Sequence, residues 1–183
     1  MHHELDSVVA RSPVFRVVNC VALAVVLFLG IASVARADVL FTDVTAGRLH
    51  TCAVKASHDL ACWGDNFWGQ ANPPAGQFRT ISAGFDHNCG ARIDGSVGCW
   101  GNNDRGQATP ASGEFVSVSA GWFYTCGLKT DLSVACWGQN VFGEAAPPPG
   151  QFRTVSAGNA GNAHTCGVKV DRSVACWGFN SSG

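Results

Sequence analysis

The segment FVSVSAGWFYTCGLKTDLSVACWG, residues 115–138, decides the fold, because related segments occur four times along the chain. Each copy opens on a Phe and continues with an Ala-Gly pair, a Cys, and a second Cys within Cys-Trp-Gly. The opening residues Phe41, Phe78, Phe115 and Phe152 are spaced by 37 residues. Self-similarity at a fixed period is typical of repeat architectures. We therefore predict a repeat domain over residues 38–183, with units 41–77, 78–114, 115–151 and 152–183.

Each unit is expected to form three short β-strands. The first runs from the Phe to the Ala-Gly pair, and the second and third carry the cysteines and form a hairpin. In the third unit, Lys129 and Ser133 would close a three-residue loop centred on Asp131. The last residue of such a loop is left-handed, which suits Gly better than other residues. The residues at this position are His58, Gly95, Leu132 and Arg172.

The two cysteines of each unit are always ten residues apart. The hairpin register places them at a non-hydrogen-bonded pair, where the strands come closest and a disulfide fits. The expected bridges are Cys52–Cys62, Cys89–Cys99, Cys126–Cys136 and Cys166–Cys176. Zinc is disfavoured because no C-x-x-C occurs, and because Tyr124 replaces the His that precedes the first Cys at His50, His87 and His164. Free thiols are the remaining alternative.

The two faces of each hairpin differ in character. In the first unit His50, Cys52, Val54, Leu60 and Cys62 share one face, and the other face carries small residues and Trp63. A three-stranded sheet cannot bury both faces alone, so the units must stack. We predict an all-β fold, a β-propeller-type stack of about four short three-stranded blades forming a partial propeller. An open stack leaves one face uncovered at each end, so we expect the chain to form a homo-oligomer through its end blades, to swap units, or to need a missing continuation in order to be soluble.

The first segment of the chain differs from the repeats. Arg11 and Arg16 precede an apolar run over residues 17–31, and Ala35-Arg36-Ala37 follows it. These are the features of a secretory signal peptide, expected over residues 1–37, with an uncleaved signal anchor as the alternative. Cleavage would leave eight of the nine cysteines and no membrane span. An even number in an exported chain favours disulfides and a secreted, periplasmic or cell-surface location.

Composition argues against two classes of function. The chain has 12 Lys and Arg against 13 Asp and Glu, so electrostatics imply no nucleic-acid partner. No Ser-His-Asp set, paired carboxylate or phosphate-binding glycine loop stands out, and the recurring glycines are explained by turn geometry. We expect neither an enzyme, nor a cofactor, nor a metal site.

Two loops vary between the units, one after Ala-Gly and one after Trp-Gly. The first and third strands run the same way, so both loops should emerge at one edge. Aromatic residues and Arg mixed with polar groups are typical of protein-binding surfaces, although Phe67 and Phe142 could instead pack beneath the connectors. The candidate partner-binding residues are Leu49, Phe67, Trp68, Phe85, Asp86, Asn103, Asp104, Arg105, Trp122, Phe123, Val141 and Phe142.

The phrase AGxxxHTCxxK…VACWGxN…GQ resembles the repeat of the regulator-of-chromosome-condensation family over about residues 41–183. The short repeat with a cysteine pair is most similar to the exported members, which include a bacterial β-lactamase inhibitor and plant Crinkly-type ectodomains. The resemblance implies a seven-bladed β-propeller that binds proteins on its rims. Four units are too few for that ring, which leaves a fragment, a half-ring that pairs, or a smaller propeller.

These observations predict an exported, non-enzymatic propeller module that binds an unidentified protein partner. One alternative is a structural envelope or matrix protein that self-assembles. Another is a truncated piece of a larger receptor-linked or enzyme-linked ectodomain. The family's nuclear exchange activity is not expected here, because a signal peptide places the chain in another compartment. Its chromatin binding is not expected either, because the mature chain is slightly acidic.

The signal peptide can be tested directly. If the A-x-A site after the apolar run is cleaved, N-terminal sequencing of exported material should begin at Asp38. An intact Met1 on membrane-bound protein would contradict cleavage and favour the signal anchor.

Overall fold

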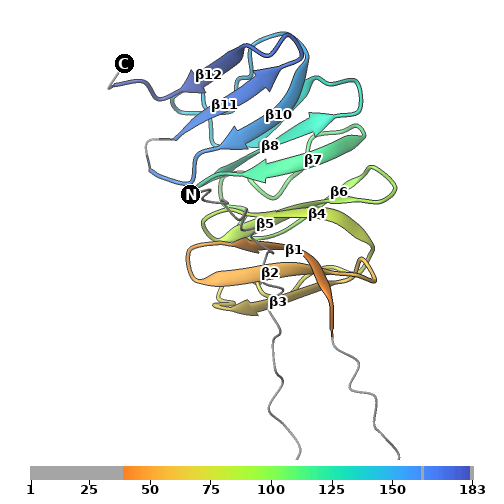
Figure 1. Ribbon diagram of the computed structural model, residues 1–183. Coiled ribbons are helices and arrows are strands. Elements are labelled where there is room, and N and C mark those ends of the chain that lie inside the picture. The colour runs from red at the N-terminus through yellow and green to blue at the C-terminus, as the bar shows by residue number, and fades with distance from the viewer. Residues whose placement is uncertain (1–38, 162, 182–183) are drawn as a thin grey trace, which may run out of the picture. The chain divides into compact units, whose positions relative to one another are not determined.

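The computed structural model describes residues 39–161 and 163–181 (Figure 1). The signal peptide predicted over residues 1–37 lies outside the described residues. The chain from Phe41 onward forms one compact unit, and its described part is built entirely from β-strands. These strands are β1 (Phe41–Ala46), β2 (His50–Lys55), β3 (Leu60–Gly64), β4 (Phe78–Ala83), β5 (His87–Arg92), β6 (Val97–Gly101), β7 (Phe115–Ala120), β8 (Tyr124–Lys129), β9 (Val134–Gly138), β10 (Phe152–Ala157), β11 (His164–Lys169) and β12 (Val174–Gly178).

Each sequence unit folds into one antiparallel three-stranded sheet, with strand orders β1-β2-β3, β4-β5-β6, β7-β8-β9 and β10-β11-β12. We number these sheets blades 1 to 4. The blades stack in chain order and do not close into a ring within the described residues (Figure 1). The predicted all-β partial propeller is therefore confirmed. Nowhere in the described chain is there a helix with the length and apolar character needed to span a membrane.

The hairpins have the predicted register. In blade 3, the Lys129 N–H donates to the Ser133 carbonyl at 2.8 Å, and the Leu132 N–H donates to the Lys129 carbonyl at 3.0 Å. The last loop residue has a positive φ in every blade, including 68° at Leu132 and 85° at Gly95. Non-glycine residues therefore accept the left-handed conformation in three blades, at roughly 1–2 kcal/mol each. Asp131 partly offsets this in blade 3 by accepting hydrogen bonds from the Ser133 N–H and hydroxyl, which also lower the pKa of Asp131.

The cysteines of each unit lie directly opposite one another on the second and third strands. Their Cα atoms are 4.0–4.1 Å apart, the close approach of a non-hydrogen-bonded pair. All four predicted bridges are present: Cys52–Cys62, Cys89–Cys99, Cys126–Cys136 and Cys166–Cys176. Each of these disulfides therefore links the two strands of one hairpin, and none of the four connects two blades.

Apolar clusters between facing sheets hold successive blades together. Between blades 1 and 2, Cys52 and Val54 pack against Phe78, Ile81 and Trp100. The equivalent residues fill the space between blades 2 and 3. The same alternation of one blade's cysteine face against the next blade's Trp face continues to blade 4. Full burial of such side chains contributes roughly 1.5–3 kcal/mol each.

The small residue in the second strand makes room for an aromatic ring of its own blade. Gly127 does not simply allow neighbouring sheets to approach, because the ring of Phe115 from its own blade covers it. A Cβ atom at Gly127 would stand 2.5 Å from that ring. The position thus seats the opening Phe of the unit, which in turn faces the preceding blade.

The first strands of neighbouring blades are joined through side chains. Each first strand is an edge strand, whose outward N–H groups have no strand partner. A hydroxyl of the preceding blade accepts from one such N–H group at 2.9 Å in every internal interface. The three pairs are Ala83 with Thr45, Ala120 with Ser82, and Ala157 with Ser119.

The two end blades each leave one face uncovered within the described chain. Trp63 in blade 1 is 45% exposed, whereas Trp100 and Trp137 in the middle blades are 9% and 8% exposed. At the other end, Val174 is 66% exposed on the cysteine face of blade 4. The end faces are therefore apolar surfaces of the kind that the internal interfaces bury.

The packing predicts that replacing a buried and an exposed tryptophan will lower the free energy of unfolding by very different amounts. Trp137→Ala should lower the free energy of unfolding by about 3–5 kcal/mol, because it removes a buried ring and its hydrogen bond to the Gln107 carbonyl. Trp68→Ala, at an exposed ring, should cost less than about 1 kcal/mol. Urea denaturation with the disulfides intact measures both, and equal losses would contradict the proposed core.

Candidate functional site

The two variable loops of each unit meet at one edge of the stack, as the sequence predicts. The Asp65 N–H donates to the Leu49 carbonyl at 2.9 Å in blade 1, joining the loop after Trp-Gly to the loop after Ala-Gly. The Asn102 N–H donates to the Asp86 carbonyl at 2.8 Å in the same way in blade 2. Gln139 repeats the contact in blade 3. We name this side, formed by residues 47–49, 65–70 and their equivalents, the loop edge.

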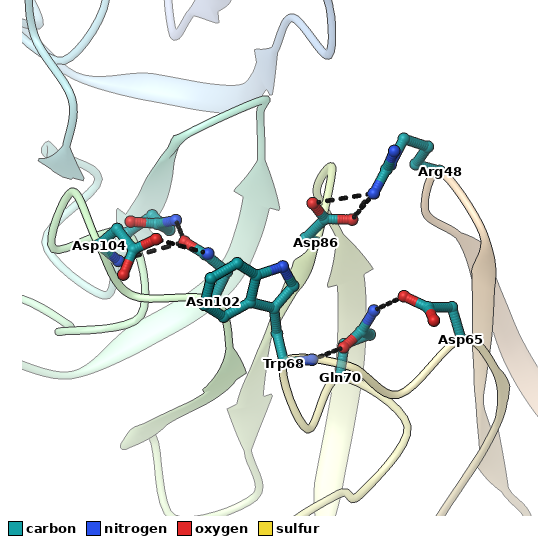
Figure 2. A network of polar contacts seen from close by, with 8 residues as sticks. Arg48, Asp65, Trp68, Gln70, Asp86, Asn102 and Asp104 are labelled. Carbon is teal, nitrogen blue, oxygen red and sulfur yellow. Dashed lines mark hydrogen bonds and ion pairs between the residues drawn. The ribbon is translucent and has the colours of Figure 1, made fainter.

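A buried residue of each connector shapes the loop edge from within. The Gln70 side chain is fully buried; its Oε1 accepts from the Trp68 N–H at 2.8 Å, and its Nε2 donates to Asp65 at 2.6 Å (Figure 2). Gln107 makes the equivalent bonds to the Arg105 N–H and to Asn102. These side-chain hydrogen bonds therefore fix the backbone of the loop from within.

Blade 3 has an equivalent hydrogen bond, but the connector residue is the acceptor and the residue after Trp-Gly is the donor. The buried carboxylate of Glu144 accepts from the Val141 and Phe142 N–H groups at 3.2 and 2.6 Å. The side-chain amide of Gln139 donates to Glu144 at 3.4 Å. A carboxylate cannot donate a hydrogen bond, so the amide at position 139 supplies the donor that Gln70 supplies in blade 1.

Aromatic rings from blades 2 and 3 form one cluster on the loop edge. The ring centroids of Phe85 and Trp122 are 5.1 Å apart, and those of Trp122 and Phe123 are 5.3 Å apart. Blade 1 extends the cluster, because the Arg48 guanidinium lies 4.5 Å from the centroid of the Phe85 ring. Arg48 is also paired with Asp86, with donor–acceptor distances of 3.1–3.3 Å (Figure 2). Such cation–π contacts and edge or stacked pairs each contribute about 0.5–1.5 kcal/mol.

The structure places the remaining candidates on the same edge but in separate groups. Phe67 is 80% exposed and meets only Trp68 edge-on, so it does not pack beneath the connector. Phe142 is partly exposed against Phe179. The other candidates, Leu49, Val141, Asn103, Asp104 and Arg105, are exposed, whereas Asp86 is largely buried by its pairing with Arg48.

Sequence reasoning did not select Arg48, although a signal was available. Arg48 occupies the same position after Ala-Gly as Phe85 and Trp122 in the next two units. Position-by-position alignment of the units would have selected it with those rings.

The histidines before the first Cys connect blades. His50 Nε2 lies 2.9 Å from the Asn88 side-chain oxygen, and His87 Nε2 lies 2.9 Å from the Thr125 hydroxyl. Because the Thr125 hydroxyl donates to the Gln107 carbonyl, its oxygen accepts from His87, which places the ring proton on Nε2.

Tyr124 reaches the same position in blade 4, where its hydroxyl lies 2.9 Å from that of Thr165. A Tyr at the position of a His thus makes an equivalent inter-blade bond. Among residues 39–161 and 163–181, no three His, Cys, Asp or Glu side chains gather as metal ligands would.

Fold and loop edge together define the chain as a partial β-propeller of disulfide-bridged blades. The family model of the Regulator of chromosome condensation (RCC1) repeat matches three segments, residues 41–70, 78–107 and 115–144. Three of the four units of this chain are therefore RCC1 repeats. Each matched segment ends at Gln70, Gln107 or Glu144, the buried connector residue.

Solved structures carry the same fold. The Crinkly WD40 ectodomain of the receptor kinase ACR4 from Arabidopsis thaliana is 34% identical, with a TM-score of 0.64 over 78% of this chain and 51% of that chain. The ectodomain of the receptor kinase CR4 from Physcomitrella patens is 28% identical, with a TM-score of 0.65 over 77% of this chain and 41% of that chain. This chain thus spans about half the length of these structures.

More distant structures show the fold alone. Prp20p from Saccharomyces cerevisiae, described with its binding to Gsp1p and histones, is 16% identical, with a TM-score of 0.67 over 77% of this chain and 46% of that chain. No curated protein sequence gives a match.

The burial of His87 predicts that the folded state becomes less stable at acid pH. Burial, with a smaller effect of the nearby His50, lowers the pKa of His87 from 6.5 to about 3. The folded state therefore binds fewer protons than the unfolded state between these values, so stability is complete above pH 6.5 and falls as the pH drops. At pH 5 the loss from His87 should be about 2 kcal/mol relative to pH 7.5.

His87→Gln should remove most of this pH dependence. His164→Gln, at the exposed equivalent position in blade 4, is the matched control and should leave it unchanged. Urea midpoints at pH 5 and 7.5 give the comparison. If the urea midpoint of His87→Gln fell between pH 7.5 and pH 5 by as much as that of the wild type, the acid sensitivity would belong to another group.

Proposed function

We propose that this chain is an exported, non-enzymatic propeller module that binds a protein partner through its loop edge. The observation that carries the proposal is the aromatic cluster of Phe85, Trp122 and Phe123 on loops that differ from unit to unit. Repetition keeps the framework residues alike in all units. The residues that vary are therefore the ones available for a specific contact.

The chemistry of the loop edge favours a protein surface as partner. The half-buried Phe85, which contacts Arg48, and the exposed Phe67 and Trp68 match the composition of interface centres, where large rings and guanidinium groups contribute most of the binding energy. The fixed backbone around Gln70 and Gln107 supports these side chains at little ordering cost.

The disulfides support export. Four bridges within 183 residues persist in oxidising compartments and are rare in the cytosol, where thiols are kept reduced. The structure that is 34% identical is the ectodomain of a receptor kinase. We therefore place this chain in the secreted, periplasmic or cell-surface fraction.

Site-specific photo-crosslinking tests the loop edge. A photoreactive phenylalanine analogue at Phe67 or Phe123 should link the partner in the exported fraction of the native host. The same analogue at Ile93, an exposed residue of the opposite, hairpin edge, serves as the control and should give no adduct.

A double substitution measures how much two aromatic residues of the loop edge contribute to partner binding. Replacing both Phe67 and Trp68 by Ser should weaken capture of the crosslinked partner at least about tenfold, the equivalent of about 1.4 kcal/mol. Ile93→Ser should leave capture within about twofold. Equal loss in both variants, or crosslinks only from Ile93, would contradict binding at the loop edge.

A further inference from the structure

We propose that acid pH opens the contact between blades 2 and 3 at the loop edge, and that protonation of His87 causes the opening. The opening is local to one contact and occurs while the rest of the stack stays folded. It divides the aromatic cluster, because Phe85 comes from blade 2 whereas Trp122 and Phe123 come from blade 3. Release of a bound partner in acid follows only if the loop edge has the function proposed above, whereas the opening itself does not depend on that function.

The side chain of His87 joins the two blades only in its neutral form. The ring is fully buried, and its Nε2 carries the proton and donates to the Thr125 hydroxyl at 2.9 Å, which links β5 to β8. Its Nδ1 is also buried and has no hydrogen-bond partner among the described residues. Protonation at Nδ1 would therefore create both a buried charge and a buried donor without an acceptor, and each of these destabilises the closed contact.

Close packing around the ring prevents His87 from turning in place to find an acceptor. The ring fills the space that a side chain at residue 84 would occupy, since a Cβ atom at Gly84 would stand 2.7 Å from the Nδ1 of His87. Residues 84 and 87 frame the short loop that carries Phe85, and the Gly84 N–H donates to the His87 carbonyl at 2.9 Å. The charged ring therefore reaches water only when this loop moves away from blade 3.

The groups that face His87 give it no counter-charge. Blade 1 presents His50, whose charge opposes protonation of His87. Blade 3 presents the neutral Thr125 hydroxyl and Tyr124, which stays protonated because burial raises its pKa. Asp86, the neighbour in the chain, is paired with a blade 1 arginine. Burial and then His50 lower the pKa of His87 from 6.5 to about 3, so below about pH 6.5 a proton is bound in the open state and not in the closed one.

The contact between blades 3 and 4 has the same plan without the titratable group. Tyr124 takes the place of His87 there, and its hydroxyl lies 2.9 Å from that of Thr165, the equivalent of Thr125. A phenol hydroxyl takes up no proton in mild acid, so this contact should not respond. The chain therefore contains a responsive and an unresponsive version of one inter-blade contact.

Two equivalent amide groups report on these contacts. The Ala120 N–H donates to the Ser82 hydroxyl across blades 2 and 3, and the Ala157 N–H donates to the Ser119 hydroxyl across blades 3 and 4, both at 2.9 Å. Hydrogen exchange of the protein alone can be followed by NMR and corrected for its intrinsic pH dependence. Protection of Ala120 should fall about thirtyfold between pH 7.5 and pH 5, as the pKa values of about 3 and 6.5 require. Protection of Ala157 should change by less than about twofold.

His87→Tyr copies the Tyr124 contact and should abolish the pH dependence at Ala120. His164→Gln, at an exposed histidine, is the control and should keep it. Circular dichroism and the unreduced mass at pH 7.5 verify that each variant is folded with four disulfides, and His87→Gln replaces His87→Tyr if the larger ring does not fit. Equal losses of protection at Ala120 and Ala157 would assign the acid effect to unfolding of the whole stack. That result, or a full loss at Ala120 that persists without His87, would overturn the proposal.

Discussion

The carbonyl oxygen of Gln70 lies buried between the first two blades and accepts hydrogen bonds from the side chains of Asn88 and Trp100, at 2.9 and 3.0 Å. The carbonyls of Gln107 and Glu144 receive the equivalent bonds in the next two interfaces. Leaving such a buried acceptor unpaired costs about 1–3 kcal/mol, so each connector is held against the following blade. The spacing of the blades and the depth of each Trp follow from this bond.

The same connector residue also determines the shape of the loop edge. The main chain of Gln70 faces the next blade, while its side chain holds the loop at Trp68 and Asp65. One residue therefore links blade stacking to loop conformation. Aromatic residues in the loops can vary without loss of the fold because the bonds that support them come from the connector and the backbone.

Much of this organisation could be predicted from the sequence. The 37-residue spacing, the cysteine register and the common edge of the loops follow from periodicity and strand geometry, because each depends on residues within one unit. Contacts between units were harder to foresee. The pairing of Arg48 with Asp86 spans 38 residues, and the burial of Gln70 leaves no mark in hydrophobic patterning, because its polar groups are satisfied locally. The left-handed conformation of Leu132 and Arg172 follows from the predicted hairpin register, although these residue types alone do not favour it.

The exchange of donor and acceptor in blade 3 has a consequence for how such genes can recombine. The amide of residue 139 donates to the carboxylate of residue 144, and the carboxylate of residue 65 accepts from the amide of residue 70. Blade 2 instead pairs two amides, Asn102 and Gln107. A crossover between these two positions that joined the first unit to the third would bring the half-buried Asp65 against the buried Glu144, and the two carboxylates would repel each other. A crossover after the connector Gln or Glu would carry the pair intact. Only the junction of the first unit's Asp65 with the third unit's Glu144 is disfavoured in this way, because the amide of Asn102 in the second unit can pair with either kind of connector residue.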